Sequence, residues 1–220
     1  MHIPDGFLTP PIFISTWVAG LVAIRYSLRK IRQRFKEKMV PLMGVMAAFI
    51  FAGQMINFPV LAGTSGHLVG GMLAALTVGP YAACIIMSLV LAVQCFVFQD
   101  GGITSLGANI LNMAVFGTIF SYGLYLGLKR IFPRRFYLVA VFLASWSSVV
   151  LSTVACGLEL GFSGVYSVRA VVSSMVFVYL FIGIGEGLIT LSILRFLTKA
   201  RPDLIYKRHT VVGKSAGEAL

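Results

Sequence analysis

Long apolar runs are the feature of this sequence that most limits the folds available to it. Six runs carry few charged residues or none, and they cover roughly residues 10–28, 39–58, 68–98, 106–128, 136–157 and 168–198. Several reach the roughly 20 residues that a helix needs to cross a bilayer, whereas barrel strands would give short segments of alternating polarity. Only 11% of the residues are charged, against about 25% in soluble domains. The sequence therefore predicts an all-α integral membrane protein.

Basic residues gather in three clusters, at 29–38, at 129–135 and after Lys199. Clusters of this kind stay in the cytoplasm and fix the orientation of a membrane protein. They account for the net charge of +11 without a nucleic-acid partner, since no recognition fold accompanies them. The expected surroundings are the lipid bilayer and no nucleic acid.

The orientation rule requires an even number of crossings between the first two basic clusters, yet only three apolar runs lie there. One run must cross twice, and the candidate is 68–98, which holds the helix-breaking pair Gly79-Pro80. We expect a short helix over 68–78 and a longer one over about 80–98. The result is a bundle of about seven transmembrane helices, with an extracytoplasmic N-terminus and a cytoplasmic C-terminus.

The chain begins MHIPDGFLTP, with one of its three histidines at position 2. The Met1 amine, the His2 backbone nitrogen and the His2 ring Nδ1 can bind one metal ion as adjacent five- and six-membered rings. The planar peptide unit keeps these three donors nearly in one plane. We expect the initiator methionine to be retained, since residue 2 is large. All three donors must be deprotonated to bind, so the affinity should fall with acidity.

A second histidine, His67 in GTSGH, is predicted to lie on the same outer side of the membrane. Pro4-Asp5-Gly6 is typical of a tight turn that can fold residues 1–3 back toward the bundle. His67 could then supply a fourth nitrogen. A square-planar set of four nitrogens suits Ni(II) or Cu(II), whereas Zn(II) prefers a tetrahedron and Mg(II) prefers oxygen ligands.

Uncharged polar residues surround the expected positions of the two histidines. Asn57 and Asn109 lie near the outer ends of predicted helices, and Thr64 and Ser65 come just before His67. Side chains of this kind orient metal-bound histidines through hydrogen bonds. Packing between helices is the alternative role.

Three segments, MHIPDGFL, GTSGHLVGG and FQDGGITSLGANILNM, resemble the CbiM/NikM family. Its members are substrate-binding subunits of energy-coupling-factor (ECF) transporters for cobalt and nickel in prokaryotic cell membranes. The resemblance covers residues 1 to about 198, and it implies seven helices and a metal site of Met1, His2 and His67. The first segment is more similar to the nickel branch, so Ni²⁺ is the implied substrate. A cobalt-specific uptake subunit for cobalamin synthesis is the alternative, and neither needs a catalytic cofactor.

The sequence shows no separate domain, linker or internal repeat. We expect a single membrane domain over 1–220, made of an N-terminal metal-binding segment (1–8), a helical bundle (9–198) and a cytoplasmic tail (199–220).

The chain is not expected to be an enzyme or to hydrolyse ATP itself. Residues 213–215 spell the Gly-Lys-Ser of a P-loop, but Arg208 stands where the loop's first glycine would be. The resemblance therefore implies partner chains, namely a transmembrane coupling subunit, cytoplasmic ATPases and a small accessory membrane subunit. Ala48 and Ala52 form a small-residue face suited to close helix contact, and we expect the coupling subunit there.

Intramembrane proteases and cation channels are two other classes of membrane protein to which the sequence could belong. Residues 63–66 spell G-T-S-G, the pattern around the serine of intramembrane proteases, but no predicted helix after His67 carries a histidine to act as the base. A cation channel would need rings of carbonyls or carboxylates along a pore, and the outer loops hold few acids. Glu186, inside the last apolar run, is expected to be a structural partner for polar groups near the cytoplasmic end, far from the outer site. A role in coupling or in release of the ion is the alternative.

Overall fold

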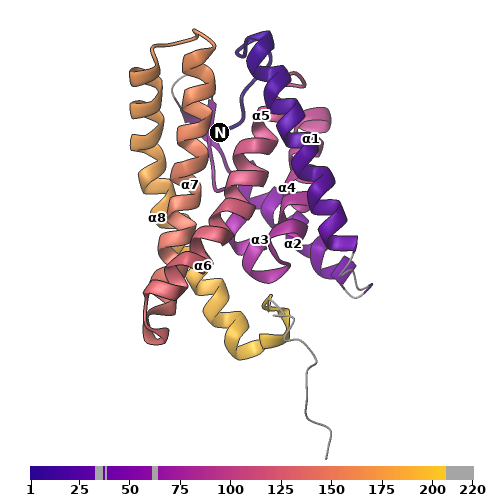
Figure 1. Cartoon of the computed structure of the whole chain (residues 1–220), viewed down its shortest axis with the longest axis vertical. Helices are drawn as coiled ribbons and strands as arrows, with labels where there is room; N and C mark the ends of the chain where they lie inside the picture. The colour runs from indigo at the N-terminus through magenta and orange to yellow at the C-terminus, as the bar shows by residue number, and fades with distance from the viewer. Residues whose placement is uncertain (33–36, 38, 61–63, 207–220) are drawn as a thin grey trace, which may run out of the picture.

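The computed structural model describes residues 1–32, 37, 39–60 and 64–206. The helices are α1 (Pro10–Arg32), α2 (Met39–Met55), α3 (Gly71–Thr77), α4 (Pro80–Phe98), α5 (Leu106–Asn109), the π-helical η2 (Ile110–Phe120), α6 (Ser121–Ile131), α7 (Tyr137–Phe162) and α8 (Val168–Ala200), with short 3₁₀ turns η3 (Arg134–Phe136) and η4 (Pro202–Leu204). Because α5, η2 and α6 run on without a break, the described chain forms seven helices, as the sequence predicts (Figure 1).

Five of these helices are long and apolar enough to cross a membrane, namely α1, α4, the continuous helix 106–131, α7 and α8. The apolar α2 is shorter. The predicted interruption at Gly79-Pro80 is confirmed, because Gly79 has a φ of +89° and Pro80 begins α4. The seven residues of α3 span about 10 Å at 1.5 Å per residue, so this helix does not cross the bilayer.

The loop after α2 contains a small antiparallel hairpin that the sequence did not predict. Strand β1 (Phe58–Val60) pairs with β2 (Thr64–Gly66), so that Pro59 lies opposite Ser65. The hairpin places His67 directly after β2, at the point where the chain turns into the bundle toward α3.

The helices form two groups around a central one. α7 and α8 pack as an antiparallel pair on one side, and α1 and α4 lie on the other (Figure 1). The π-helical η2 contacts α1, α3, α4 and α7, so it occupies the middle of the bundle. Every residue of α3 is buried. A wholly buried short helix therefore fills the space below the hairpin.

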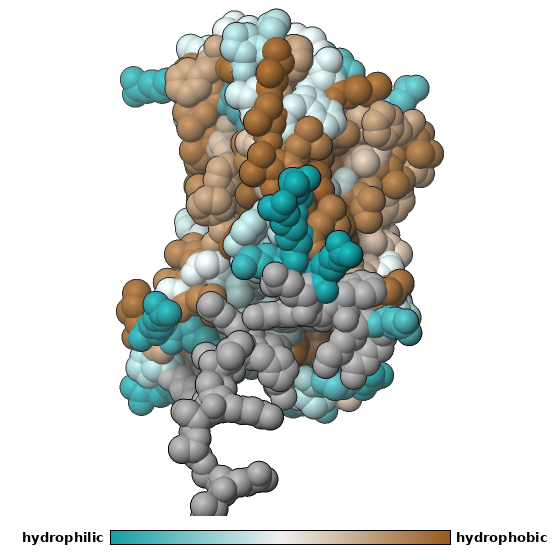
Figure 2. All heavy atoms as spheres, turned by 45° about the vertical axis from the view of Figure 1, so that its right-hand side comes forward, coloured by the Kyte–Doolittle hydropathy of each residue, from teal (hydrophilic) through white to brown (hydrophobic). Residues whose placement is uncertain are grey.

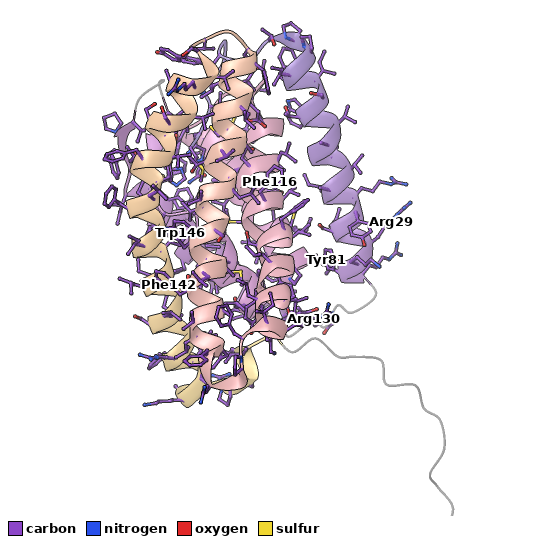
Figure 3. All side chains as sticks on the ribbon, turned by 60° about the vertical axis from the view of Figure 1, so that its left-hand side comes forward. Arg29, Tyr81, Phe116, Arg130, Phe142 and Trp146 are labelled. Atoms are coloured by element: carbon purple, nitrogen blue, oxygen red, sulfur yellow. The ribbon has the colours of Figure 1, made fainter. Side chains whose placement is uncertain are left out.

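Most basic side chains lie at one end of the bundle, although Arg169 lies in the first turn of α8, at the other end. The last turns of α1, α6 and α8 carry Arg29, Lys30, Arg32, Lys129, Arg130 and Lys199. Figure 3 shows Arg29 and Arg130 toward the lower end of the bundle. In Figure 2 much of the side of the molecule is apolar, with hydrophilic residues toward both its upper and its lower end. The protein is a multi-pass membrane protein, and the side to which its basic end faces stays a prediction from charge.

Close contact between α3 and η2 depends on glycine. A Cβ added at Gly71 would collide with the carbonyl group of Gly117, which is backbone and cannot move aside. Gly71→Ala is expected to lower the free energy of unfolding by about 1–3 kcal/mol through overpacking. Thermal unfolding of the purified protein in detergent, followed by circular dichroism, measures this. Gly127→Ala in α6 is the matched control, because its Cβ would meet nothing within 4 Å, and an equal loss of stability in both variants would contradict the prediction.

Candidate metal centre

The N-terminal segment folds back into the bundle. Gly6 has a φ of +82°, in the turn predicted for Pro4-Asp5-Gly6. Beyond this turn Met1, His2 and Ile3 are buried, with at most 3% of their surface exposed. The first residues of the chain are therefore part of the protein core.

The loop between α4 and α5, together with Asn109 at the end of α5, holds this segment through hydrogen bonds. Asn109 Oδ1 accepts from the Ile3 amide at 2.9 Å, and its Nδ2 donates to the Ile3 carbonyl at 3.3 Å. The Gly102 amide donates to the same carbonyl at 2.9 Å. The Asp5 carboxylate accepts from the amides of Ile103, at 3.0 Å, and Thr104, at 2.7 Å. These bonds fix the length and direction of the returning segment.

The Met1 amine lies between His67 and α8. Its nitrogen is 3.3 Å from His67 Nε2 and donates to the Tyr179 hydroxyl at 2.7 Å and to the Ser65 carbonyl. His67 Nδ1 is 2.7 Å from the Leu68 carbonyl, which can only accept. Nδ1 therefore carries the ring proton, and Nε2 presents a lone pair toward the amine.

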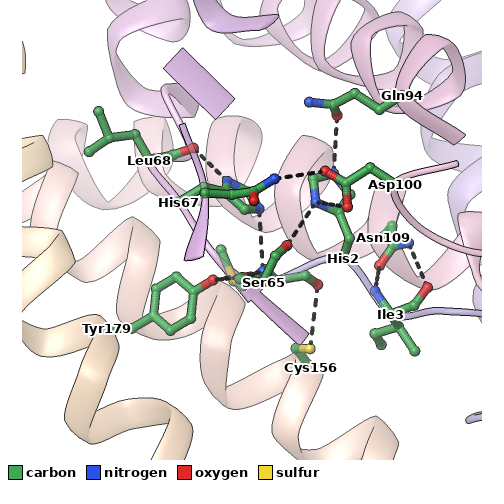
Figure 4. A network of polar contacts seen from close by, with 12 residues as sticks. His2, Ile3, Ser65, His67, Leu68, Gln94, Asp100, Asn109, Cys156 and Tyr179 are labelled. Carbon is green, nitrogen blue, oxygen red and sulfur yellow. Dashed lines mark hydrogen bonds and ion pairs between the residues drawn. The ribbon is translucent and has the colours of Figure 1, made fainter. Parts of the chain in front are cut away.

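The His2 ring lies beside that of His67, with ring centroids 4.7 Å apart (Figure 4). His2 Nε2 is 3.0 Å from Gln94 Oε1. When Nε2 carries the ring proton and donates it to this oxygen, Nδ1 presents its lone pair. Around Nδ1 lie the Ser65 hydroxyl at 3.3 Å and Asp100 Oδ1 at 3.4 Å. Each ring is thus held with one of its two nitrogens unprotonated, and the two rings share the same cluster of polar groups.

Burial keeps the basic groups of this cluster neutral. Desolvation lowers the pKa of the Met1 amine to about 5 and that of His2 to about 3, and it holds the pKa of His67 well below its ordinary value. The pKa of the Asp100 carboxyl is raised, mainly by desolvation. At neutral pH the amine and both rings are therefore ready to donate electron pairs without first losing a proton.

Within the described ranges, no group of three or more His, Cys, Asp or Glu side chains is arranged to hold a metal ion. The Met1 amine nitrogen, 3.3 Å from His67 Nε2, is a further nitrogen that lies beside these side chains. The neighbouring sulfur atoms are engaged elsewhere. The Met1 thioether accepts from the Thr153 hydroxyl at 3.4 Å, and the Cys156 thiol donates to the Met1 carbonyl at 3.7 Å.

The other residues singled out from the sequence lie close by, with different contacts from those expected. Asn109 holds Ile3 rather than a histidine. Asn57 lies on the surface and donates to Asp100 at 3.4 Å, so it reaches His2 only through that carboxylate. Thr64 is buried and pairs across the hairpin with Val60.

The Ser65 hydroxyl lies 3.3 Å from a histidine ring nitrogen, but the ring is that of His2 rather than one on a later helix. The Ser65 carbonyl accepts from Tyr179 at 2.6 Å and from the Met1 amine. Residue 63 of the G-T-S-G pattern and residues 207–220 of the tail, with His209 and the Gly-Lys-Ser fragment, lie outside the described residues.

Glu186 was expected far from the site, and this was wrong. Its buried carboxylate accepts from the amides of Val69 at 2.6 Å and Gly70 at 2.9 Å, two and three residues after His67. The sequence argument treated α8 as a separate crossing, whereas the loop after His67 descends to meet it. Gln94, Asp100 and Tyr179 were also missed. A lone acid in an apolar run was the available signal for Glu186, but nothing local distinguishes Tyr179.

Ala48 and Ala52 both lie exposed on α2. Val45 and Phe49 on the same helix are also exposed, at 67% and 49%. The described part of the chain therefore leaves an apolar, partly small-residue face of α2 uncovered.

Known proteins resemble this chain over nearly its whole length. Residues 2–204 match the family CbiM, described as a cobalt uptake substrate-specific transmembrane region. A putative fused nickel transport protein of Archaeoglobus fulgidus is 39% identical over 210 residues, which are 94% of this chain and 69% of that protein. A putative metal transport protein of Haloquadratum walsbyi is 39% identical over 208 residues, 94% of each chain.

The fold is also shared with a solved structure. A truncated transition metal transporter superimposes with a TM-score of 0.84 and 31% identity, covering 90% of this chain and 99% of that one. The sequence match, the structural match and the seven-helix bundle agree, and the chain belongs to the CbiM family of membrane proteins for nickel and cobalt transport.

Proposed function

We propose that this chain binds Ni²⁺ through the Met1 amine, the His2 amide nitrogen, His2 Nδ1 and His67 Nε2, and that it delivers the ion as the substrate-specific subunit of an ECF transporter. The observation that supports this most directly is the 3.3 Å separation of the Met1 nitrogen from His67 Nε2. Two nitrogens bound to one ion at about 2 Å and at right angles would lie about 2.9 Å apart. A small movement therefore brings both onto one ion.

The ring protons support the same assignment. Gln94 and the Leu68 carbonyl accept the ring protons of His2 and His67, respectively. The nitrogens left unprotonated, His2 Nδ1 and His67 Nε2, are those that the proposed chelate uses. Partners of this kind fix the tautomer and the orientation of metal-bound histidines.

Four nitrogens in one plane would suit Ni(II) or Cu(II), and the names of relatives favour nickel of these two. Relatives include a putative fused nickel transport protein and a putative cobalt transport protein of Methanosphaera stadtmanae. Cobalt uptake is therefore the second candidate, and it would use the same donors.

Transport would need partner chains that supply energy. The uncovered face of α2 with Ala48 and Ala52 suits a transmembrane coupling subunit, with ATPases and a small accessory membrane subunit completing the complex. The basic ends of α1, α6 and α8 would face the cytoplasm. The metal centre near the opposite end would then receive the ion from outside.

The role of the terminal amine can be tested by extension. Adding one residue before Met1 is expected to lower nickel affinity by at least about 100-fold, since the amine can no longer close a ring with the His2 amide and the buried segment has no space for it. Isothermal titration of the extended protein measures this, with its mass verified. Protease removal of the extension is the control and should restore binding. Equal affinity before and after removal would contradict the free-amine chelate.

Each histidine of the site should be needed for tight binding. His2→Ala and His67→Ala are each expected to reduce nickel affinity by about 100-fold or more, because each removes a coordinating nitrogen. His209→Ala removes the remaining histidine of the chain and is the matched control. Chelator competition measures the affinities, and circular dichroism shows that the variants are folded. Tight binding by a folded variant of either histidine would remove that residue from the site.

Nickel binding should release about one proton at pH values between about 6 and 8. The pKa of the Met1 amine is about 5 and that of His2 about 3, so in this range both are already unprotonated and the His2 amide alone loses a proton. Affinity should then rise about tenfold per pH unit, and more steeply below about pH 5, where the amine becomes protonated. Titration calorimetry in buffers of different ionisation enthalpy counts the protons. Release of two or three would mean that the apo amine or rings are charged.

A further inference from the structure

The Asp100 carboxylate occupies an unusual place beside the chelate. Its Oδ1 lies 3.4 Å from His2 Nδ1, the ring nitrogen that carries a lone pair when Nε2 donates to Gln94. Two atoms that both carry lone pairs do not attract one another. The contact becomes favourable when a positive charge lies between them or beside both. Asp100 is 20% exposed on its side chain and His2 is 2% exposed, so the carboxylate lies on the outer side of the ring.

The turn after α4 directs this carboxylate inward. Gln99 ends the helix with a φ of +57°, which is rare for a residue with a side chain, and it is the one such residue in the described part of the chain. The Asp100 amide donates back to the Gln94 carbonyl at 3.0 Å, and Gly101 follows with a φ of +95°. Gln94 therefore contacts the His2 ring through its side chain, and its main-chain carbonyl accepts from the Asp100 amide.

This inference rests on the proposed function. In that function the carboxylate balances the charge of the bound ion. A neutral amine, two neutral imidazoles and one deprotonated amide leave a bound divalent ion with a net charge of +1. Burying that charge without a counter-ion is costly. Asp100 is the carboxylate in contact with the donor set among the described residues, and its charge of −1 makes the loaded centre neutral. Asn57, at 3.4 Å from Oδ2, holds its other oxygen.

We propose that Asp100 is the counter-charge of the transported divalent cation, contacting it on the outer side of the His2 ring and attracting it as it arrives from solution. Asp100 therefore positions the ion through its charge and does not replace any of the four nitrogen donors. Its contribution differs from that of the histidines, because it acts through charge and should depend on ionic strength.

The test compares Asp100→Asn with Asp100→Glu by nickel titration and stopped-flow binding. Asp100→Asn keeps the size and removes the charge, so we expect affinity to fall about 10- to 100-fold, with slower association that varies less with salt. Asp100→Glu keeps the charge and should retain most of the affinity. Asp203→Asn removes one carboxylate from the opposite end, where it pairs with Arg201, and should bind nickel as the native protein does.

The stability of the metal-free variant separates charge compensation from a structural role. Apo Asp100→Asn should unfold at the same temperature as the native protein or higher, because the replaced oxygen faced a lone pair. Native-like nickel affinity in Asp100→Asn, or an equal loss in Asp100→Glu, would overturn the inference, and so would a loss of apo stability that matches the loss of affinity. Failure of the native protein itself to bind nickel would instead overturn the proposed function.

Discussion

The pairing of Asn109 with both main-chain groups of Ile3 is the interaction on which the rest of the site depends. The Ile3 amide and carbonyl are both hydrogen-bonded, as they would be in a β-strand. These two bonds hold Met1 and His2 inside the bundle. The amide of Gly102 and the carboxylate of Asp5 make the same attachment from neighbouring positions. A terminus held by many hydrogen bonds can position a main-chain donor as accurately as a side chain.

The second half of the site is set by α8. Tyr179 donates to the Ser65 carbonyl, and Glu186, two turns further along the same helix, accepts from the amides of Val69 and Gly70. His67 lies between these attachment points. A displacement of α8 along its axis would therefore move both flanks of His67 together, and the far end of that helix lies at the basic end of the bundle.

Much of the fold could be predicted because membrane helices are dictated by apolar length. The break at Gly79-Pro80 also followed from local chemistry. The approach of His2 to His67 could be anticipated, since a turn and a shared membrane face were both visible. The contacts of Tyr179 and Glu186 could not, because they depend on how a loop packs against a helix more than 100 residues away. The hairpin at 58–66 could not either, because each of its strands has only three residues, too few to give an alternating pattern. The predicted role of Asn57 and Asn109 in orienting metal-bound histidines stays a prediction. Their hydrogen bonds go to the Asp100 carboxylate and to the main chain of Ile3, respectively.

The burial of α3 has a consequence for the cell that contains this protein. Its sequence, GMLAALT, places apolar or small side chains between the His67 loop and the basic end of the bundle, where the Leu76 carbonyl accepts from the Tyr206 amide at 2.9 Å. A bare divalent ion would lose its hydration along α3, whose own side chains include no carboxylate, imidazole or thiol to replace the lost water. In this conformation α3 therefore blocks the passage of ions through the bundle. A membrane can hold many copies of it without dissipating its ion gradients, because conduction would require the helices themselves to rearrange.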